Sequence, residues 1–128
     1  MFRKNLHLIL SVLIVLPAAL FYGLIPHQTL PLLFDFEVQS TDLKNVFRAI
    51  LGLYLAFSAL WIVGIVKPDF WKMATISNAF FMFGLVFGRF LSMILDGMPS
   101  LTFSIGIIGE LILALFALYQ YQKYSKAI

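Results

Sequence analysis

Three charged residues interrupt long apolar runs of this sequence, and they are the ones best suited to chemistry: Arg48, Arg89 and Glu110. A charge at the centre of a membrane-spanning helix costs roughly 2.5–3.5 kcal/mol on insertion scales, so such a residue usually forms an ion pair or belongs to a functional site. Counted from Asp42, Asp96 and Pro99, a rise of 1.5 Å per residue puts Arg48 about 9 Å deep, Arg89 about 10 Å and Glu110 about 16 Å. We therefore predict that the three side chains meet in one half of a helix bundle.

The helical spacing around these charges supports the same convergence. At 100° per residue, each charge lies on a helical stripe that also carries other polar or small residues, and small residues let helices approach closely. The stripes are Thr41, Asn45, Arg48, Gly52, Leu55 and Ala59; then Asn78, Met82, Leu85, Arg89, Ser92 and Asp96; then Phe103, Gly106, Glu110, Ala114, Ala117 and Tyr121. We expect Asn45 and Asn78 to form interhelical hydrogen bonds, and Ser92 to bond within its own helix.

The chemistry of these stripes favours the binding of an acidic group. Two guanidinium groups suit a carboxylate or a phosphate, because each presents a planar fork of donors. Arg48 and Arg89 against Glu110 leave one positive charge, which Asp96 or a bound anion would neutralise. The candidate ligand-binding residues are Arg48, Arg89, Glu110, Asn45, Ser92 and Asp96. The alternative is a structural network in which Glu110 bridges both arginines.

Other site chemistries find little support. The chain has no cysteine, which excludes disulfides, thiolate metal sites and iron–sulfur clusters. His7 and His27 are far apart, so we predict no metal site and no cofactor. Ser92 has no base within reach and no nucleophile–base spacing is visible, which argues against an enzyme and leaves the catalytic set empty.

The composition decides the class of protein. Apolar residues make up 62% of the 128 residues and charged residues 12%, against about half and a quarter in soluble domains. We predict an all-α integral membrane protein, with one four-helix transmembrane domain over residues 1–128. Each apolar stretch is long enough to cross a bilayer. The predicted spans are 6–25, 43–66, 73–95 and 101–122, and the longest loop is 26–42.

The basic residues predict the orientation of these spans. Lysine and arginine cluster at the ends that carry the termini, so both termini are expected in the cytoplasm of a bacterial inner membrane, with loop 26–42 outside. The net charge of +3 therefore indicates topology and not nucleic-acid binding. Trp61 and Trp71 are expected as interfacial aromatics. The start of the chain also resembles a signal peptide, but its apolar run is long and favours a retained helix.

The outer loop and its boundary carry further expectations. Loop 26–42 is rich in apolar residues, so it should lie on the membrane surface or fold over the mouth of the bundle. Ser40 or Thr41 can cap the next helix. Gly97 is expected at the C-terminal cap of the third span.

The residues around the three charges resemble a small bacterial membrane family known as a domain of unknown function, number 4345. The resemblance covers about 35–121 and rests on three marks. They are Asn45, Arg48 and Ala49; Gly88, Arg89, Ser92, Asp96, Gly97 and Pro99; and Glu110. It implies a four-helix membrane protein and no assigned activity.

Three functions fit these features. In the first, an inner-membrane protein uses an arginine-containing pocket in the outer half of its bundle to bind an anionic lipid or lipid-like small molecule. In the second, a small proton-linked transporter works through Glu110 and forms a homo-oligomer, because four helices enclose little volume. In the third, a structural or accessory membrane subunit has no ligand. The expected partners are the bilayer and, in the first case, an anionic amphiphile.

Overall fold

Four long helices dominate the computed structural model, which describes residues 2–127 and contains no strand within that range. The long helices are α1 (Phe2–Gly23), α3 (Thr41–Val66), α4 (Trp71–Asp96) and α5 (Leu101–Tyr124). The short elements are α2 (Pro26–Leu33), the 3-10 turn η1 (Pro68–Phe70) and the 3-10 turn η2 (Ser125–Ala127). All four long helices are long and apolar enough to cross a membrane, as predicted, and their bounds lie within a few residues of the predicted spans.

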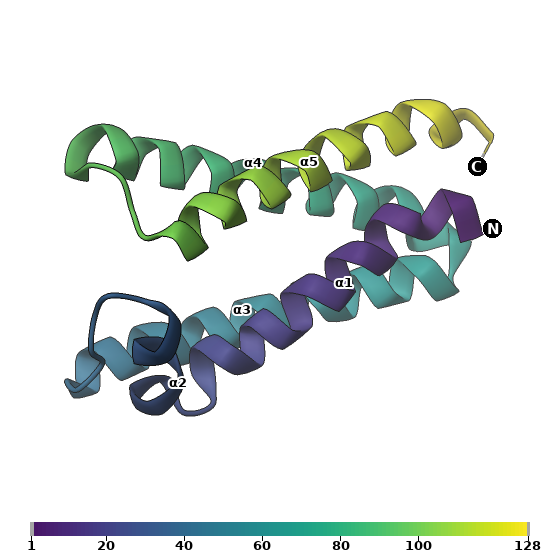
Figure 1. Cartoon of the computed structure of the whole chain (residues 1–128). Coiled ribbons are helices and arrows are strands. Elements are labelled where there is room, and N and C mark those ends of the chain that lie inside the picture. The colour runs from purple at the N-terminus through teal and green to yellow at the C-terminus, as the bar shows by residue number, and fades with distance from the viewer. Residues whose placement is uncertain (1, 128) are drawn as a thin grey trace.

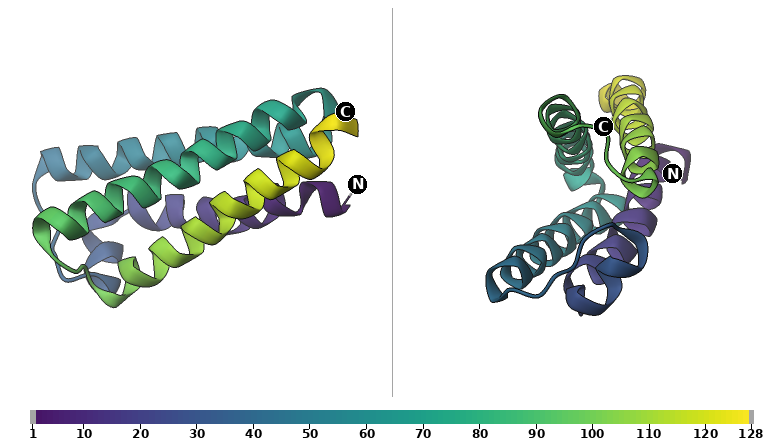
Figure 2. Two further views of the ribbon diagram at one scale, coloured as in Figure 1. Left: turned by 90° about the horizontal axis from the view of Figure 1, so that it is seen from above. Right: turned by 60° about the vertical axis from the view of Figure 1, so that its left-hand side comes forward.

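The long helices form two antiparallel pairs. Helix α1 packs along α3 and α4 packs along α5, and Figure 1 shows the α4–α5 pair above the α1–α3 pair. The pairs come together at the end that carries both termini and spread apart at the end that carries α2. A second view shows the same two pairs nearly end-on (Figure 2, right).

The helix ends follow from local chemistry. Ser40 caps α3, because its Oγ accepts a hydrogen bond from the backbone N–H of Leu43 at 3.0 Å. Gly97 ends α4 with φ +94°, a backbone conformation that favours glycine, as expected for a C-terminal cap. Pro26 begins α2 at a first-turn position, where its missing N–H has no cost. The predicted loop 26–42 is thus not all loop, because its first eight residues form α2.

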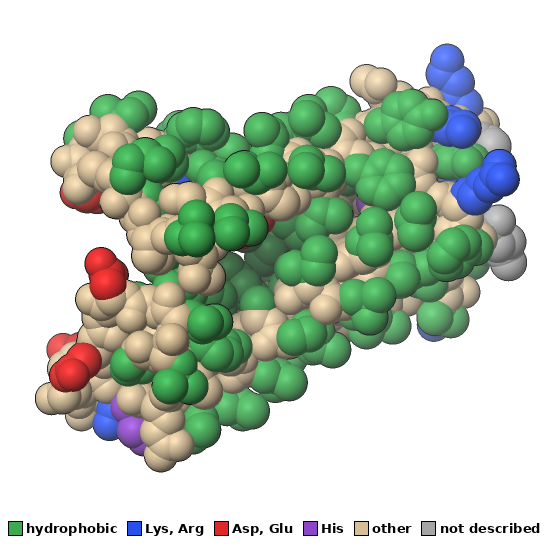
Figure 3. Space-filling view, viewed as in Figure 1, with side chains coloured by type: hydrophobic (Ala, Val, Ile, Leu, Met, Phe, Trp, Pro, Cys, Tyr) green, Lys and Arg blue, Asp and Glu red, His purple; other side chains and the backbone are tan. Residues whose placement is uncertain are grey.

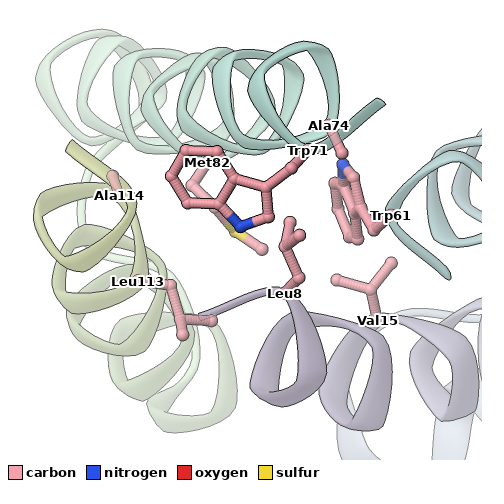
Figure 4. Close-up of a cluster of buried hydrophobic side chains, with 8 residues drawn as sticks. All are labelled: Leu8, Val15, Trp61, Trp71, Ala74, Met82, Leu113 and Ala114. Atoms are coloured by element: carbon pink, nitrogen blue, oxygen red, sulfur yellow. The ribbon is translucent and has the colours of Figure 1, made fainter. Parts of the chain in front are cut away.

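An apolar cluster fills the half of the bundle near the termini (Figure 4). It includes Trp61 and Trp71, both 0% exposed, so the prediction that they are interfacial aromatics is wrong. Each indole N–H has a partner inside the protein. Trp61 donates to Ser77 Oγ at 3.1 Å, and Trp71 donates to the carbonyl of Lys4 at 3.2 Å. Because their polar edges are satisfied, these rings can serve as core residues.

A second apolar cluster closes part of the opposite end. It is built on Leu30, Phe34 and Val38, which follow one another through α2 and the segment after it. Phe34 stacks on Phe103 of α5 with ring centroids 4.1 Å apart. Thr102 Oγ1 also donates to the carbonyl of Leu33 at 3.3 Å. The segment after α1 thus folds over the mouth between the helix pairs, one of the two arrangements expected for it.

Charges are distributed unevenly along the bundle. On the face shown in Figure 3, acidic side chains gather at the α2 end and most basic side chains at the end with the termini. The long sides between these ends are largely apolar. Many large apolar side chains on them are exposed, among them Phe80, Phe87, Ile94 and Ile112.

Candidate functional site

The centre of the candidate site is an ion pair between α4 and α5. Arg89 Nε lies 2.6 Å from Glu110 Oε1, and Arg89 Nη2 donates to Glu110 Oε2 at 3.1 Å. The two side chains are 22% and 16% exposed, so the pair is largely removed from solvent. The guanidinium also lies 5.1 Å from the ring centroid of Phe103, within range of a cation–π interaction. The predicted meeting of Arg89 and Glu110 is confirmed.

Arg48 does not join this pair, contrary to the prediction. Its Nη1 donates to the carbonyls of Gly23 and Leu24, at 3.0 Å each. The last carbonyls of a helix have no partner within the helix, and a cation near them is favourable. The end of α1 lies against α3, so the carbonyls of Gly23 and Leu24 bind the Arg48 guanidinium in place of Glu110. Counting depth along α3 could place Arg48 at the right level but could not show this competing acceptor.

A cavity of about 320 Å³ lies between the two helix pairs and includes the ion pair in its wall. Figure 3 shows a hollow on the outside of the molecule between α1 and α5. Its lining is mostly apolar, with Arg89 and Glu110 as the charged members. The lining residues are Ile14, Val15, Ala18, Tyr22, Phe34, Tyr54, Met82, Leu85, Arg89, Thr102, Phe103, Ile105, Gly106, Gly109, Glu110 and Leu113. An apolar cavity with a few convergent polar groups is typical of a small-molecule site.

The predicted stripes of α4 and α5 form two walls of this cavity. The α4 stripe contributes Met82, Leu85 and Arg89, and the α5 stripe contributes Phe103, Gly106 and Glu110. A Cβ added at Gly106 or at the neighbouring Gly109 would have no heavy atom within 4 Å. The glycines therefore leave space beside Glu110.

Ser92 and Asp96 lie beyond the ion pair toward the end of α4. Ser92 Oγ donates to Asp96 Oδ2 at 2.9 Å, and both residues are exposed. A second hollow of about 240 Å³ is lined by Arg89, Ser92, Pro99 and Phe103. Arg89 and Phe103 thus line both the cavity and the second hollow. Asp96 lies at the rim, accepts the hydrogen bond from Ser92 and is not part of the ion pair.

The two asparagines do not behave as expected. Asn45 is exposed on α3 and does not line the cavity. Asn78 is 0% exposed, but neither its Oδ1 nor its Nδ2 has a hydrogen-bond partner within residues 2–127. The predicted interhelical bond of Asn78 is therefore not formed to another side chain or backbone group of the described chain.

Three aromatic residues of the site were not predicted from the sequence. Tyr22 and Phe34 come from the end of α1 and the segment after α2, and Tyr54 comes from α3. Tyr22 contacts Tyr54 edge-on, with ring centroids 5.9 Å apart. Tyr22 lies three residues before the end of the predicted first span, in the same half of the bundle as the charges, and this position was the available signal.

Comparison with known proteins identifies a family but no activity. The family model described as a domain of unknown function, DUF4345, matches residues 4–121. No curated protein and no solved structure matches the chain. Within the described residues, no group of three His, Asp or Glu side chains is arranged to hold a metal ion.

Proposed function

We propose that the central cavity binds a lipid-like small molecule. The chain belongs to the DUF4345 family, a domain of unknown function, so this proposal starts from the cavity and not from a known activity. The observation that carries this proposal is an apolar cavity of about 320 Å³ with the Arg89–Glu110 pair in its wall. The apolar lining suits a hydrocarbon or ring body, and the pair suits one polar end.

The charge balance of the site restricts which headgroup the ligand can carry. Glu110 already occupies Arg89 Nε and one donor of Nη2, so the pair is formally neutral. Arg89 Nη1 still has donors, and the Glu110 oxygens still have lone pairs. With Arg48 directed elsewhere, an acidic headgroup would meet only Arg89 and would be repelled by Glu110. We therefore favour an uncharged headgroup that both donates and accepts hydrogen bonds, such as a hydroxyl or an amide, over the anionic headgroup expected from the sequence.

The proposed setting is a bacterial inner membrane. Four apolar helices with exposed apolar side chains suit insertion in a bilayer. Basic residues near the termini favour a cytoplasmic location for that end, which places the cavity in the outer half.

Filling the cavity tests the proposal. Gly106 lines the cavity, and a Cβ added there meets no heavy atom within 4 Å, so the side chain of Gly106→Leu should extend into ligand volume. Gly52 on α3 also has open space but does not line the cavity, so Gly52→Leu is the matched control. The chain would be purified in lipid nanodiscs, and native mass spectrometry would be used to detect any small molecule that stays bound.

The expected result is a bound species on the wild type and on Gly52→Leu that is lost on Gly106→Leu. Equal retention by all three would contradict a ligand in this cavity. If none of the three carries a bound species, the structural or accessory interpretation replaces the proposal.

Proton-linked transport through Glu110 is the second candidate, and one feature favours it. Arg89 and Phe103 alone contribute to both hollows, so movement of these two side chains would join them. The ion pair would have to open for Glu110 to exchange a proton. A pH-driven flux into proteoliposomes that is abolished in Glu110→Gln would support transport, and the absence of flux in the wild type would exclude it.

A further inference from the structure

Several polar side chains are buried in the apolar core on the terminus side of the cavity, and in three of them no side-chain polar atom has a hydrogen-bond partner within the described residues. These three are Ser11 of α1, Ser58 of α3 and Asn78 of α4, with exposures of 0%, 1% and 0%. Neither serine hydroxyl, and neither polar atom of the Asn78 side chain, has a hydrogen-bond partner within the described residues. Buried polar groups are almost always hydrogen-bonded, so four such atoms in one region require a partner. We call these three residues the core polar layer.

The three side chains face the same interior. Ser11 lies between Leu8 and Val15 on α1, and Asn78 lies midway between Ala74 and Met82 on α4. Ser58 lies three residues, nearly one turn, before Trp61 on α3. All five apolar neighbours belong to one buried cluster, and Figure 4 shows their side chains converging in the space between the helices.

The three side chains also lie at similar depth. His7 Nε2 and Thr75 Oγ1 are 2.9 Å apart, which fixes the register of the parallel helices α1 and α4. Ser11 and Asn78 are each about one turn further along their helices from that contact.

The register of α3 agrees with this depth. A Cβ added to Gly64 would lie 2.3 Å from the Cβ of Ala74, which fixes the antiparallel register of α3 and α4. Ser58 then lies within about one turn of Asn78 along the bundle.

The chemistry of the layer selects its ligand. The Asn78 amide presents two N–H donors and a carbonyl acceptor, and each serine hydroxyl can donate and accept. A cation would satisfy the oxygens but not the amide N–H groups, and an anion would do the reverse. Water satisfies both, and buried waters commonly make about three bonds to otherwise unpaired groups. We propose that the core polar layer is a binding site for internal water molecules that bridge α1, α3 and α4.

Magnetisation transfer from water tests this site directly. The protein would be labelled with ¹⁵N at asparagine and alanine, placed in lipid bilayers and studied by water-edited solid-state NMR. The Asn78 side-chain amide would be assigned by its loss in Asn78→Leu. The exposed Asn45 is the hydrated reference, and the backbone amide of the fully buried Ala114 is the dry reference. Transfer to Asn78 well above that to Ala114 is expected, and transfer no greater than that to Ala114 would overturn the proposal.

A double-mutant cycle provides a second readout that does not depend on the assignment. Bridging water makes Ser11→Ala and Asn78→Leu each lower the melting temperature, by about 4 °C, and makes the double variant lose less than the sum. A dry layer gives the opposite result, because removal of an unpaired polar group raises the melting temperature and the two gains add. Ser104→Ala is the control, since Ser104 Oγ donates to the carbonyl of Ser100, the residue just before α5, at 3.1 Å, and its effect should add to that of Asn78→Leu.

Discussion

The Arg89–Glu110 pair should be more costly to break than to remove. Arg89→Met leaves Glu110 with an uncompensated charge, and the loss of one partner of a buried pair costs about 3 kcal/mol or more. Because both side chains are partly exposed, we expect the loss of unfolding free energy to lie near the lower end of this range, at about 3 kcal/mol. The double variant Arg89→Met, Glu110→Met leaves no buried charge and should recover most of the stability. Thermal unfolding of the three proteins in nanodiscs measures the difference, and a double variant less stable than Arg89→Met would contradict this account.

Arg48 should matter for the end of α1 and not for the cavity. Arg48→Met removes two hydrogen bonds to the carbonyls of Gly23 and Leu24, each worth about 1 kcal/mol. We expect a moderate loss of thermal stability and no change in any molecule that co-purifies. If Arg48→Met lost such a molecule while its melting temperature stayed normal, Arg48 would instead be a ligand-binding residue.

At the scale of residues, the sequence predicted the pair but not its surroundings. Depth and helical phase of Arg89 and Glu110 were sufficient, because both lie on helices that pack directly against each other. The same reasoning failed for Arg48, since its partners are backbone carbonyls, which side-chain patterns do not reveal. The interfacial expectation for Trp61 and Trp71 failed for a related reason, because their indole N–H groups have partners across the bundle.

Close packing between helices depends on two glycines. A Cβ at Gly23 would lie 2.2 Å from the Cβ of Leu51, and a Cβ at Gly64 would lie 2.3 Å from that of Ala74. The first contact joins α1 to α3 and the second joins α3 to α4. Gly23→Ala and Gly64→Ala should each destabilise the protein by about 1–3 kcal/mol, because overpacking forces the helices apart.

The control for this prediction is a glycine with free space. Gly52 is exposed and has no heavy atom within 4 Å of an added Cβ. Gly52→Ala should be neutral or stabilising by up to about 1 kcal/mol, from helix propensity. Equal melting temperatures for all three alanine variants would contradict this account, because they would show that the α1–α3 and α3–α4 contacts accept an extra methyl group without loss of stability.

At the scale of elements, apolar length predicted all four long helices within a few residues. Their apolar runs exceed what a loop would carry, and proline, glycine and charged residues mark the breaks. Helix α2 was missed because its eight residues contain two prolines, one at its first position and one inside it. Its role over the mouth of the bundle was foreseen as one of two arrangements, because residues such as Leu30 and Phe34 are too apolar for a solvated loop. Which helix it would cover could not be predicted, since that depends on the Phe34–Phe103 stack between distant segments.

At the scale of the whole molecule, the proposed orientation follows from the separation of charges along the bundle. Both termini lie at one end, together with most basic residues (Figures 1 and 3). The α4–α5 connection lies at the opposite end, with α2. If basic residues stay in the cytoplasm, a site in that connection faces outward and a site near the C-terminus faces inward. The chain contains no cysteine, so single cysteines can report on each end without background.

Met98→Cys and Lys126→Cys are suitable reporters, because both positions are exposed. A membrane-impermeant maleimide added to intact bacterial spheroplasts should label Met98→Cys and should reach Lys126→Cys only after the membrane is opened. The reverse pattern would invert the topology and move the cavity to the cytoplasmic half. Labelling of both sites in intact spheroplasts would contradict a spanning arrangement, because helices that cross the bilayer place their two ends on different sides. The side of the cavity also decides whether its ligand is drawn from the outer or the inner leaflet.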